Sequence, residues 1–170
     1  MELLGCLLYL CLTRPDIWVM VSELSKYNSD PGVPMWNALV HLMRYLIKTS
    51  ALQLVFRASK LTGVDLKGFS DAGFHGSTDT TRSRCGYLIF FCSCLIAYKS
   101  SLQKVTAHST CEAEFLAASM ATREIVFLRM MIEELGFKQT GPTPLAVDNE
   151  AAVKLTQNKI LTGRTKTIQA

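Results

Sequence analysis

The first fifty residues carry apolar side chains at the spacing of helices rather than strands. An almost continuous apolar run covers residues 3–12, and Pro15 predicts the first turn of a second helix that continues over 17–27. A third helix is predicted to begin near Pro34, after the turn-forming residues 28–32. Its predicted apolar stripe consists of Trp36, Leu39, Val40, Met43, Leu46 and Ile47. The pattern predicts a small helical unit without catalytic residues.

Beyond residue 52 the apolar runs become short and rich in β-branched and aromatic residues, which is typical of strands. Strands are predicted over residues 64–72, 85–91 and 95–98. The last two are separated by a tight connection that contains no glycine, which is unusual for a hairpin. A fourth strand is predicted over residues 144–147, followed by a short helix over 150–157.

The clearest element is a long helix predicted from Thr110 to Leu135. Ser109 is the expected N-cap residue, and Glu112 stands where a carboxylate can bond back to the N-cap amide. Gly136 follows the last apolar residue, a position where glycine commonly ends a helix. The order of elements predicts three antiparallel strands, a crossover helix and a parallel fourth strand, which together form an α/β sandwich.

Composition and charge are those of a folded chain. The 170 residues are 49% hydrophobic and 19% charged, which excludes a disordered or low-complexity protein. The formal net charge of +4 permits nucleic-acid binding without requiring it. The six cysteines include no CxxC pair, which argues against a zinc ribbon. The first apolar run lacks the basic start of a signal peptide and is too short to cross a bilayer. We therefore expect an intracellular protein, cytoplasmic or nuclear, that is not secreted and does not bind a membrane.

Three acidic residues are the candidates for chemistry. Asp71 ends the first strand of the sandwich, and Asp148 ends the fourth strand beside a helix start. Glu114 lies on the stripe of the long helix that must face the sheet, whereas Glu112 lies roughly 200° away on a more polar face. Each acid alone is more often a turn or cap residue. As a set they predict a metal site, because clustered carboxylates hold the divalent ions used in phosphodiester hydrolysis.

Four motifs, in this order, resemble one family. They read GFSDAGFHG at 68–76, RSRCGY at 82–87, STCEAEFLA at 109–117 and VDNEAA at 147–152. These motifs are similar to the RNase H domain of copia-type LTR retrotransposon Pol polyproteins. Farther upstream, residues 4–10 and 13–17, with Trp36 and residues 44–46, look like the segment that joins reverse transcriptase to RNase H. The resemblance covers almost the whole chain.

The resemblance implies a mixed sheet flanked by helices, preceded by a small helical segment. By this resemblance residues 1–60 form a helical C-terminal or connection segment of reverse transcriptase, and residues 61–170 form an RNase H-like domain truncated at its C-terminus. The implied partners are an RNA–DNA hybrid and the reverse transcriptase core of the parent polyprotein.

The implied activity is metal-dependent endonucleolytic cleavage of RNA in RNA–DNA hybrids, with Mg²⁺ or Mn²⁺ as cofactor. The resemblance assigns catalytic and metal-ligating roles to Asp71, Glu114 and Asp148. The family's helix motif matches the four residues that begin at Glu114, in agreement with the argument from the buried stripe.

The chain departs from the family late in its sequence. RNase H domains carry a fourth carboxylate after a fifth strand, yet no Asp or Glu follows Glu150. A stretch that normally reads His, Ile, Asp has Thr167 and Gln169 instead. We therefore expect impaired two-metal catalysis. The alternative is a catalytically inactive nucleic-acid-binding or interaction remnant of a retrotransposon.

Several polar residues are candidates for contacts with nucleic-acid phosphates. Arg82 and Arg84 follow the first acidic motif and are expected to border the site, and Ser77 could add a neutral contact. Lys166 belongs to a basic stretch near the end of the sequence. That stretch either contacts the phosphates of a hybrid or forms a solvated tail.

Overall fold

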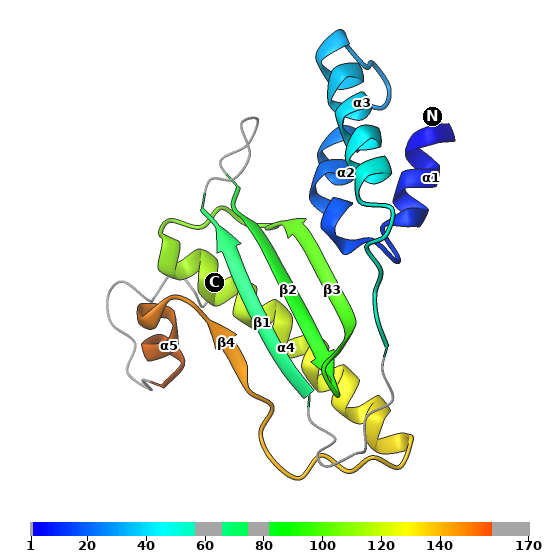
Figure 1. Cartoon of the computed structure of the whole chain (residues 1–170). Helices are drawn as coiled ribbons and strands as arrows, with labels where there is room; N and C mark the ends of the chain where they lie inside the picture. The colour runs from blue at the N-terminus through cyan, green and yellow to red at the C-terminus, as the bar shows by residue number, and fades with distance from the viewer. Residues whose placement is uncertain (1, 57–65, 75–81, 158–170) are drawn as a thin grey trace. The chain divides into compact units, whose positions relative to one another are not determined.

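The computed structural model describes residues 2–56, 66–74 and 82–157 (Figure 1). The chain divides into two compact units, residues 1–56 and 57–170, and each has a hydrophobic core of its own. Within these described ranges, no helix combines the length and the apolar character that a membrane-spanning segment needs.

The N-terminal unit is helical, as the sequence pattern predicts. Its elements are α1 (Glu2–Leu10), the single 3-10 turn η1 (Pro15–Ile17), α2 (Trp18–Ser25) and α3 (Val33–Lys48). Pro15 stands in the first turn of η1, where its fixed φ suits a helix start and its missing N–H leaves no bond unmade. The buried core consists of Leu7, Cys11, Ile17, Val21, Leu24 and Leu42.

The apolar stripe predicted for α3 is partly wrong. Leu42 is the buried residue of this helix, and Leu39 and Met43 pack beside it as expected. In contrast, Trp36 is 61% exposed and Ile47 is 72% exposed. The spacing of apolar residues indicates the side of the helix that packs, but it does not say how much of that side the short helices α1 and α2 cover.

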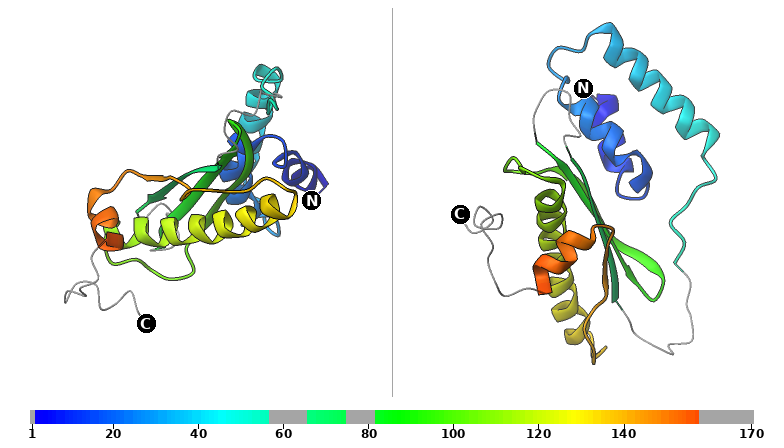
Figure 2. Two further views of the ribbon diagram at one scale, coloured as in Figure 1. Left: turned by 90° about the horizontal axis from the view of Figure 1, so that it is seen from below. Right: turned by 90° about the vertical axis from the view of Figure 1, so that its left-hand side faces the viewer.

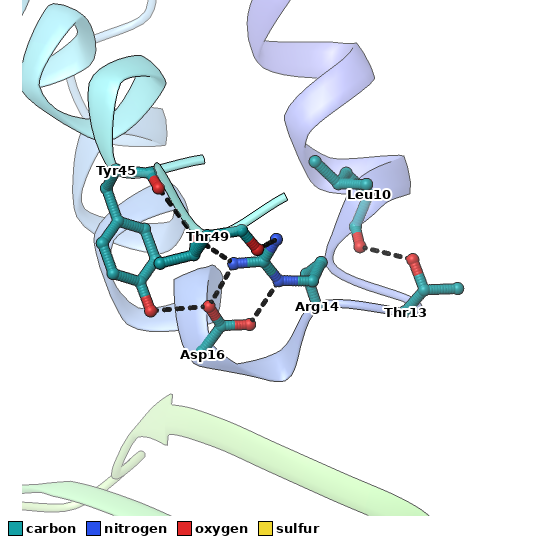
Figure 3. Close-up of polar contacts among 6 residues, drawn as sticks. All are labelled: Leu10, Thr13, Arg14, Asp16, Tyr45 and Thr49. Atoms are coloured by element: carbon teal, nitrogen blue, oxygen red, sulfur yellow. Dashed lines mark hydrogen bonds and ion pairs between the residues drawn. The ribbon is translucent and has the colours of Figure 1, made fainter. Parts of the chain in front are cut away.

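Hydrogen bonds of Arg14 and Asp16, which form an ion pair, tie the start of η1 to the end of α3 (Figure 3). Arg14 donates two hydrogen bonds to the carboxylate of Asp16, at 2.9 and 2.7 Å, and two more to the carbonyl and hydroxyl oxygens of Thr49, at 3.1 and 2.8 Å. The hydroxyl of Tyr45 donates to the same carboxylate at 2.9 Å. Arg14 is only 8% exposed, whereas the side chain of Asp16 is 30% exposed, so the guanidinium is buried and its carboxylate partner reaches solvent. The hydrogen bond from Arg14 lowers the pKa of Asp16.

Removing Arg14 should destabilise the N-terminal unit more than removing the Tyr45 hydroxyl does. Arg14→Ala removes a buried guanidinium that donates four hydrogen bonds, two of them to a carboxylate, and we expect a loss of about 2–3 kcal/mol. Tyr45→Phe removes one hydrogen bond and should cost about 1 kcal/mol. Both tryptophans, Trp18 and Trp36, lie in this unit, so tryptophan fluorescence during urea unfolding measures the difference. Equal losses in the two variants would contradict the special weight given to the ion pair.

The C-terminal unit is built on a four-stranded mixed sheet with strand order β3-β2-β1-β4. Its elements are β1 (Leu66–Gly73), β2 (Arg84–Phe91), β3 (Cys94–Leu102), α4 (Thr110–Glu134), β4 (Leu145–Val147) and α5 (Glu150–Gln157). The first three strands are antiparallel, and β4 pairs in parallel with β1. The predicted order and directions are confirmed, and so is the α/β class: a mixed sheet flanked by helices, consistent with an RNase H-like fold.

Helix α4 lies across one face of the sheet (Figures 1 and 2). Its buried residues are Ala113, Glu114, Ala117, Ala118, Ala121, Ile125, Leu128 and Ile132, which confirms the predicted stripe. Gly68 allows the helix to come close to β1. A Cβ atom at this position would lie 2.8 Å from Cδ1 of Ile125 and 2.9 Å from Cδ1 of Leu145, so a larger residue would require these two side chains to shift.

Both ends of α4 are capped. The Ser109 hydroxyl accepts a hydrogen bond from the Glu112 amide at 3.1 Å, as predicted. The Glu112 carboxylate accepts from the amide of His108 at 2.8 Å, one residue before the expected N-cap amide. Gly136 has a φ of +90° and ends the helix. Its amide and that of Phe137 bond back to carbonyl oxygens of α4, at 3.0 and 3.1 Å.

The hairpin between β2 and β3 turns through Cys92 and Ser93 without a glycine. Both residues have positive φ, 49° and 64°, as the type I′ turn requires. This turn matches the right-handed twist of the strands, but the left-handed backbone is unfavourable for residues that carry a Cβ atom. The local sequence therefore adopts a strained turn because the long pairing of β2 with β3 demands it.

Replacing Ser93 with glycine should stabilise the C-terminal unit. Glycine adopts positive φ without the Cβ clash, and we expect a gain of about 0.5–1 kcal/mol in the free energy of unfolding. The matched control is Ser119→Gly on the exposed side of α4, where the same change should cost about 0.5–1 kcal/mol. Far-UV circular dichroism during urea unfolding measures both. A loss of stability in Ser93→Gly would contradict the strain argument.

Candidate functional site

Three carboxylates from three elements meet at one end of the sheet. Asp71 lies near the end of β1, Glu114 lies near the start of α4, and Asp148 directly follows β4. One oxygen atom from each lies within 4.8 Å of the other two. The parallel register sets this arrangement: Ser70 pairs with Val147, so the residue that follows each one reaches the same level of the sheet. The structure thus brings the three expected acids together, and their chemical role stays a prediction.

Glu114 is the buried member of the cluster, with 5% of its surface exposed. Its Oε1 accepts a hydrogen bond from the amide of Ala72 at 3.1 Å. Its Oε2 is buried and has no hydrogen-bond partner among the described residues. Burial raises the pKa of Glu114, the Ala72 hydrogen bond opposes the rise, and the nearby negative charges of Asp148 and Asp71 add to it.

The cluster suits a hard divalent cation. A buried carboxylate oxygen without a donor is unfavourable, and two further carboxylates make the site more negative. Oxygen ligands of this kind are the ones that Mg²⁺ and Mn²⁺ prefer. Asp71 and Asp148 are exposed, so the cluster is open to solvent on the side away from Glu114. The donor set and the orphaned oxygen therefore fit a cation that reaches the site from solvent.

A shallow groove of about 460 Å³ lies beside the carboxylates. Gly68 faces α4, so its neighbours along β1, Phe69 and Asp71, point to the opposite face of the sheet. Leu88 of β2 pairs with Phe69 and lies on that same face. Together with Ala146 and Asp148 these residues line the groove, which is apolar at its centre and acidic at one end.

The predicted phosphate ligands fall into two groups. Arg84 begins β2 and pairs with Gly73, two residues after Asp71 on the same face of the sheet. Arg82 is exposed and precedes it. Arg84 therefore lies on the same face of the sheet as Asp71, and the contact of either arginine with a phosphate stays a prediction. Ser77 and Lys166 lie outside the described residues, as do Thr167 and Gln169.

Sequence reasoning missed the groups that hold Glu114 in place. The Ala72 amide is one, and no side-chain pattern marks a backbone donor. The side chain of Gln103 is another: its Nε2 donates to the carbonyl oxygen of Ala113 at 2.9 Å and braces the first turn of α4. Gln103 is buried although it follows a strand among polar residues, so its burial depends on long-range packing that the local sequence does not indicate.

The chain is similar to retrotransposon polyproteins over nearly its whole length. It is 36% identical over 165 residues to a retrovirus-related Pol polyprotein from transposon TNT 1-94 of Nicotiana tabacum, which covers 96% of this chain. It is 32% identical over 166 residues to the Pol polyprotein from transposon RE2 of Arabidopsis thaliana, which covers 98% of this chain. The chain spans only 12% and 11% of the length of these two relatives.

A shorter relative carries a different name. The chain is 37% identical over 125 residues to secreted RxLR effector protein 161 of Plasmopara viticola, which covers 73% of this chain and 87% of that protein. No family model matches the chain, and no solved structure matches it.

Replacing Glu114 with glutamine should stabilise the metal-free protein at neutral pH. The folded state raises the pKa of Glu114, so it binds this proton more tightly than the unfolded chain does. The ionised carboxylate therefore lowers the free energy of unfolding progressively as the pH rises from the ordinary carboxyl range to the raised pKa. Glu114→Gln removes this penalty, and its advantage should vanish at pH values below the ordinary carboxyl pKa.

Urea unfolding in EDTA at a series of pH values, followed by circular dichroism, measures this difference. The matched control is Glu112→Gln, two residues away on the same helix. Glutamine keeps an acceptor for the His108 amide, so this variant should change the free energy of unfolding by less than about 1 kcal/mol at every pH. A Glu114→Gln variant that is less stable than the parent at neutral pH would show that the protein itself stabilises the carboxylate.

Proposed function

We propose, because the chain belongs to the copia-type Pol polyproteins of retrotransposons, that its C-terminal unit is a metal-dependent nuclease that cleaves RNA in RNA–DNA hybrids. The observation that carries the proposal is the convergence of Asp71, Glu114 and Asp148, whose oxygen atoms lie within 4.8 Å of one another. Among the described residues, no salt bridge joins these carboxylates to a basic side chain. Such a cluster is suited to binding metal ions that act on phosphodiesters.

In this proposal the three carboxylates hold Mg²⁺ or Mn²⁺. When bound, such an ion supplies Lewis-acid stabilisation of the negative charge that develops on a phosphodiester. Glu114 is held by the Ala72 amide, which fixes the direction of its carboxylate before any ion arrives. Asp71 and Asp148 are exposed and would complete the site on the side from which a substrate approaches.

The residues around the cluster support a nucleic-acid substrate. Arg84 lies on the same face of the sheet as Asp71, and Arg82 precedes it in the sequence, so in this proposal both would neutralise phosphates that flank the reacting bond. Phe69 and Leu88 give the groove an apolar floor that suits sugars or bases. The RNA–DNA hybrid as substrate follows from the family resemblance of the motifs.

A catalytically inactive nucleic-acid-binding segment is the second candidate, and one observation favours it. No Asp or Glu follows Glu150, so the sequence lacks the fourth carboxylate that the resemblance leads us to expect. Three carboxylates are enough to hold an ion, but a missing ligand would weaken catalysis that depends on two ions.

Cleavage of a labelled RNA–DNA hybrid in Mg²⁺ or Mn²⁺ tests the proposal. Asp71→Asn should lower the cleavage rate by more than about 100-fold, because loss of an outer-shell partner alone can reduce metal-site activity by that factor. Glu112→Gln is the matched control, since this residue caps α4 and lies outside the cluster. It should cleave at the rate of the unmodified protein.

Two outcomes would contradict the nuclease proposal in different ways. Equal cleavage by the unmodified protein and Asp71→Asn would show that the carboxylate cluster is not the active site. Folded protein that binds the hybrid but does not cleave it in either metal would support the inactive nucleic-acid-binding candidate.

A further inference from the structure

A second groove lies on the α4 side of the sheet, and Tyr87 and Lys99 line both this groove and the apolar groove beside the carboxylates. It has a volume of about 570 Å³ and is formed by β2, β3, α4 and the loop between the last two elements. We name it the β3–α4 groove. Its lining residues are Cys85, Tyr87, Lys99, Ser101, Leu102, Gln103, Lys104, Val105, Leu116, Met120, Arg123 and Glu124.

The β3–α4 groove has an excess of positive charge. Lys99, Lys104 and Arg123 come from three different elements and all are exposed. Among the described residues none of the three takes part in a salt bridge. Glu124 is the acid that lines the groove, and burial together with the nearby charge of Glu124 raises the pKa of the Tyr87 hydroxyl to about 12. Three cations therefore surround the groove, and none of them forms a salt bridge with a described carboxylate. The groove is large enough to hold a phosphate group.

The β3–α4 groove differs from another basic groove of the same unit in the state of its arginine. This other groove, of about 560 Å³, is lined by Lys67, Lys138 and Arg129 among others. Its guanidinium is already occupied, because Arg129 donates to the carbonyl oxygens of Gly141 at 2.8 Å and Gln139 at 3.1 Å. Arg129 serves to hold the loop that leads to β4. Arg123 has no such bonds to the chain among the hydrogen bonds of the described residues.

The strand register places the β3–α4 groove level with the carboxylates. Asp71 pairs with Gly86, and Gly86 pairs with Ser100, which lies between Lys99 and Ser101. Neighbouring strands are about 4.8 Å apart, so the groove begins roughly 10 Å from the strand of Asp71. A duplex carries one phosphate per strand for each ~3.4 Å of its axis. A duplex with one phosphate at the carboxylates therefore presents others at this distance.

We propose that the β3–α4 groove binds a backbone phosphate of the same nucleic acid whose reacting bond lies at the carboxylates. The inference rests on the proposed nuclease function and adds a second contact for its substrate. Arginine recognises phosphate through paired hydrogen bonds, and lysines act as point charges on flexible stems. The Ser101 hydroxyl adds a neutral contact, and Leu116 and Met120 provide an apolar wall for a sugar.

The test compares two variants with the same change of net charge. One carries Lys104→Gln and Arg123→Gln, which remove the two cations that line the β3–α4 groove but not the groove beside the carboxylates. The matched control carries Lys48→Gln and Lys138→Gln, two exposed cations elsewhere on the chain. Fluorescence anisotropy with a labelled RNA–DNA hybrid, in EDTA to prevent cleavage, gives the dissociation constant over a range of salt concentrations.

We expect the groove variant to bind the hybrid at least about 10-fold more weakly than the unmodified protein at low salt. Its log–log salt dependence should be shallower by about 0.9 for each phosphate that the groove no longer neutralises. The control should stay within about threefold of the unmodified protein. Equal weakening in the two variants, or an unchanged salt slope in the groove variant, would overturn the inference.

Two further readouts separate the possible outcomes. Inorganic phosphate titrated at constant ionic strength should not displace the hybrid, and displacement at low concentration would show a site for free phosphate esters instead. The cleavage assay is scored separately. If the groove variant binds the hybrid more weakly but no protein cleaves it, the groove inference holds and the nuclease proposal is wrong. If the unmodified protein cleaves the hybrid and the groove variant binds it equally well, only the groove inference is wrong.

Discussion

The close packing of α4 on β1 is the contact on which the C-terminal unit depends. At Gly68 the strand has no side chain, and Ile125 of the helix and Leu145 of β4 fill the space that a Cβ atom would need. The helix can therefore lie low enough on the sheet for the chain to return as β4, in parallel beside β1. The same low position brings Glu114 within 3.1 Å of the Ala72 amide. A packing constraint in the middle of the sheet thus determines where an acid lies at its end.

Two carboxylates of the chain have opposite surroundings. In the N-terminal unit the carboxylate of Asp16 has the guanidinium of Arg14 and the hydroxyl of Tyr45 as partners, and its pKa falls. In the C-terminal unit Glu114 has one backbone donor and two negative neighbours, and its pKa rises. Folding alone gains nothing from the second arrangement. The counter-charge for Glu114 would therefore have to come from outside the chain, which is the physical reason to expect a cation there.

Local patterns predicted the parts of the fold that depend on single elements. The buried stripe of α4, its serine cap and its glycine end follow from spacing along one helix, and the three acids were placed by the ends of their elements. The α3 stripe was partly wrong at Trp36 and Ile47, because the sequence does not reveal how much of a helix its short neighbours cover. The Ala72 amide and Gln103 were missed because their bonds join residues that only the tertiary fold brings together.

The geometry of the site bears on the size of its substrate. Asp71 and Asp148 are exposed, and the hollows on the two faces of the sheet are open grooves rather than enclosed cavities. An open site cannot hold a small molecule by surrounding it, so the binding energy has to come from contacts spread along an extended ligand. A polyanion supplies such contacts, because each phosphate that meets a cation releases counterions and adds to affinity. Under the proposed function, cations that lie outside the groove beside the carboxylates, such as Lys104 and Arg123, would then determine how tightly a substrate binds, while the carboxylates would determine where it reacts.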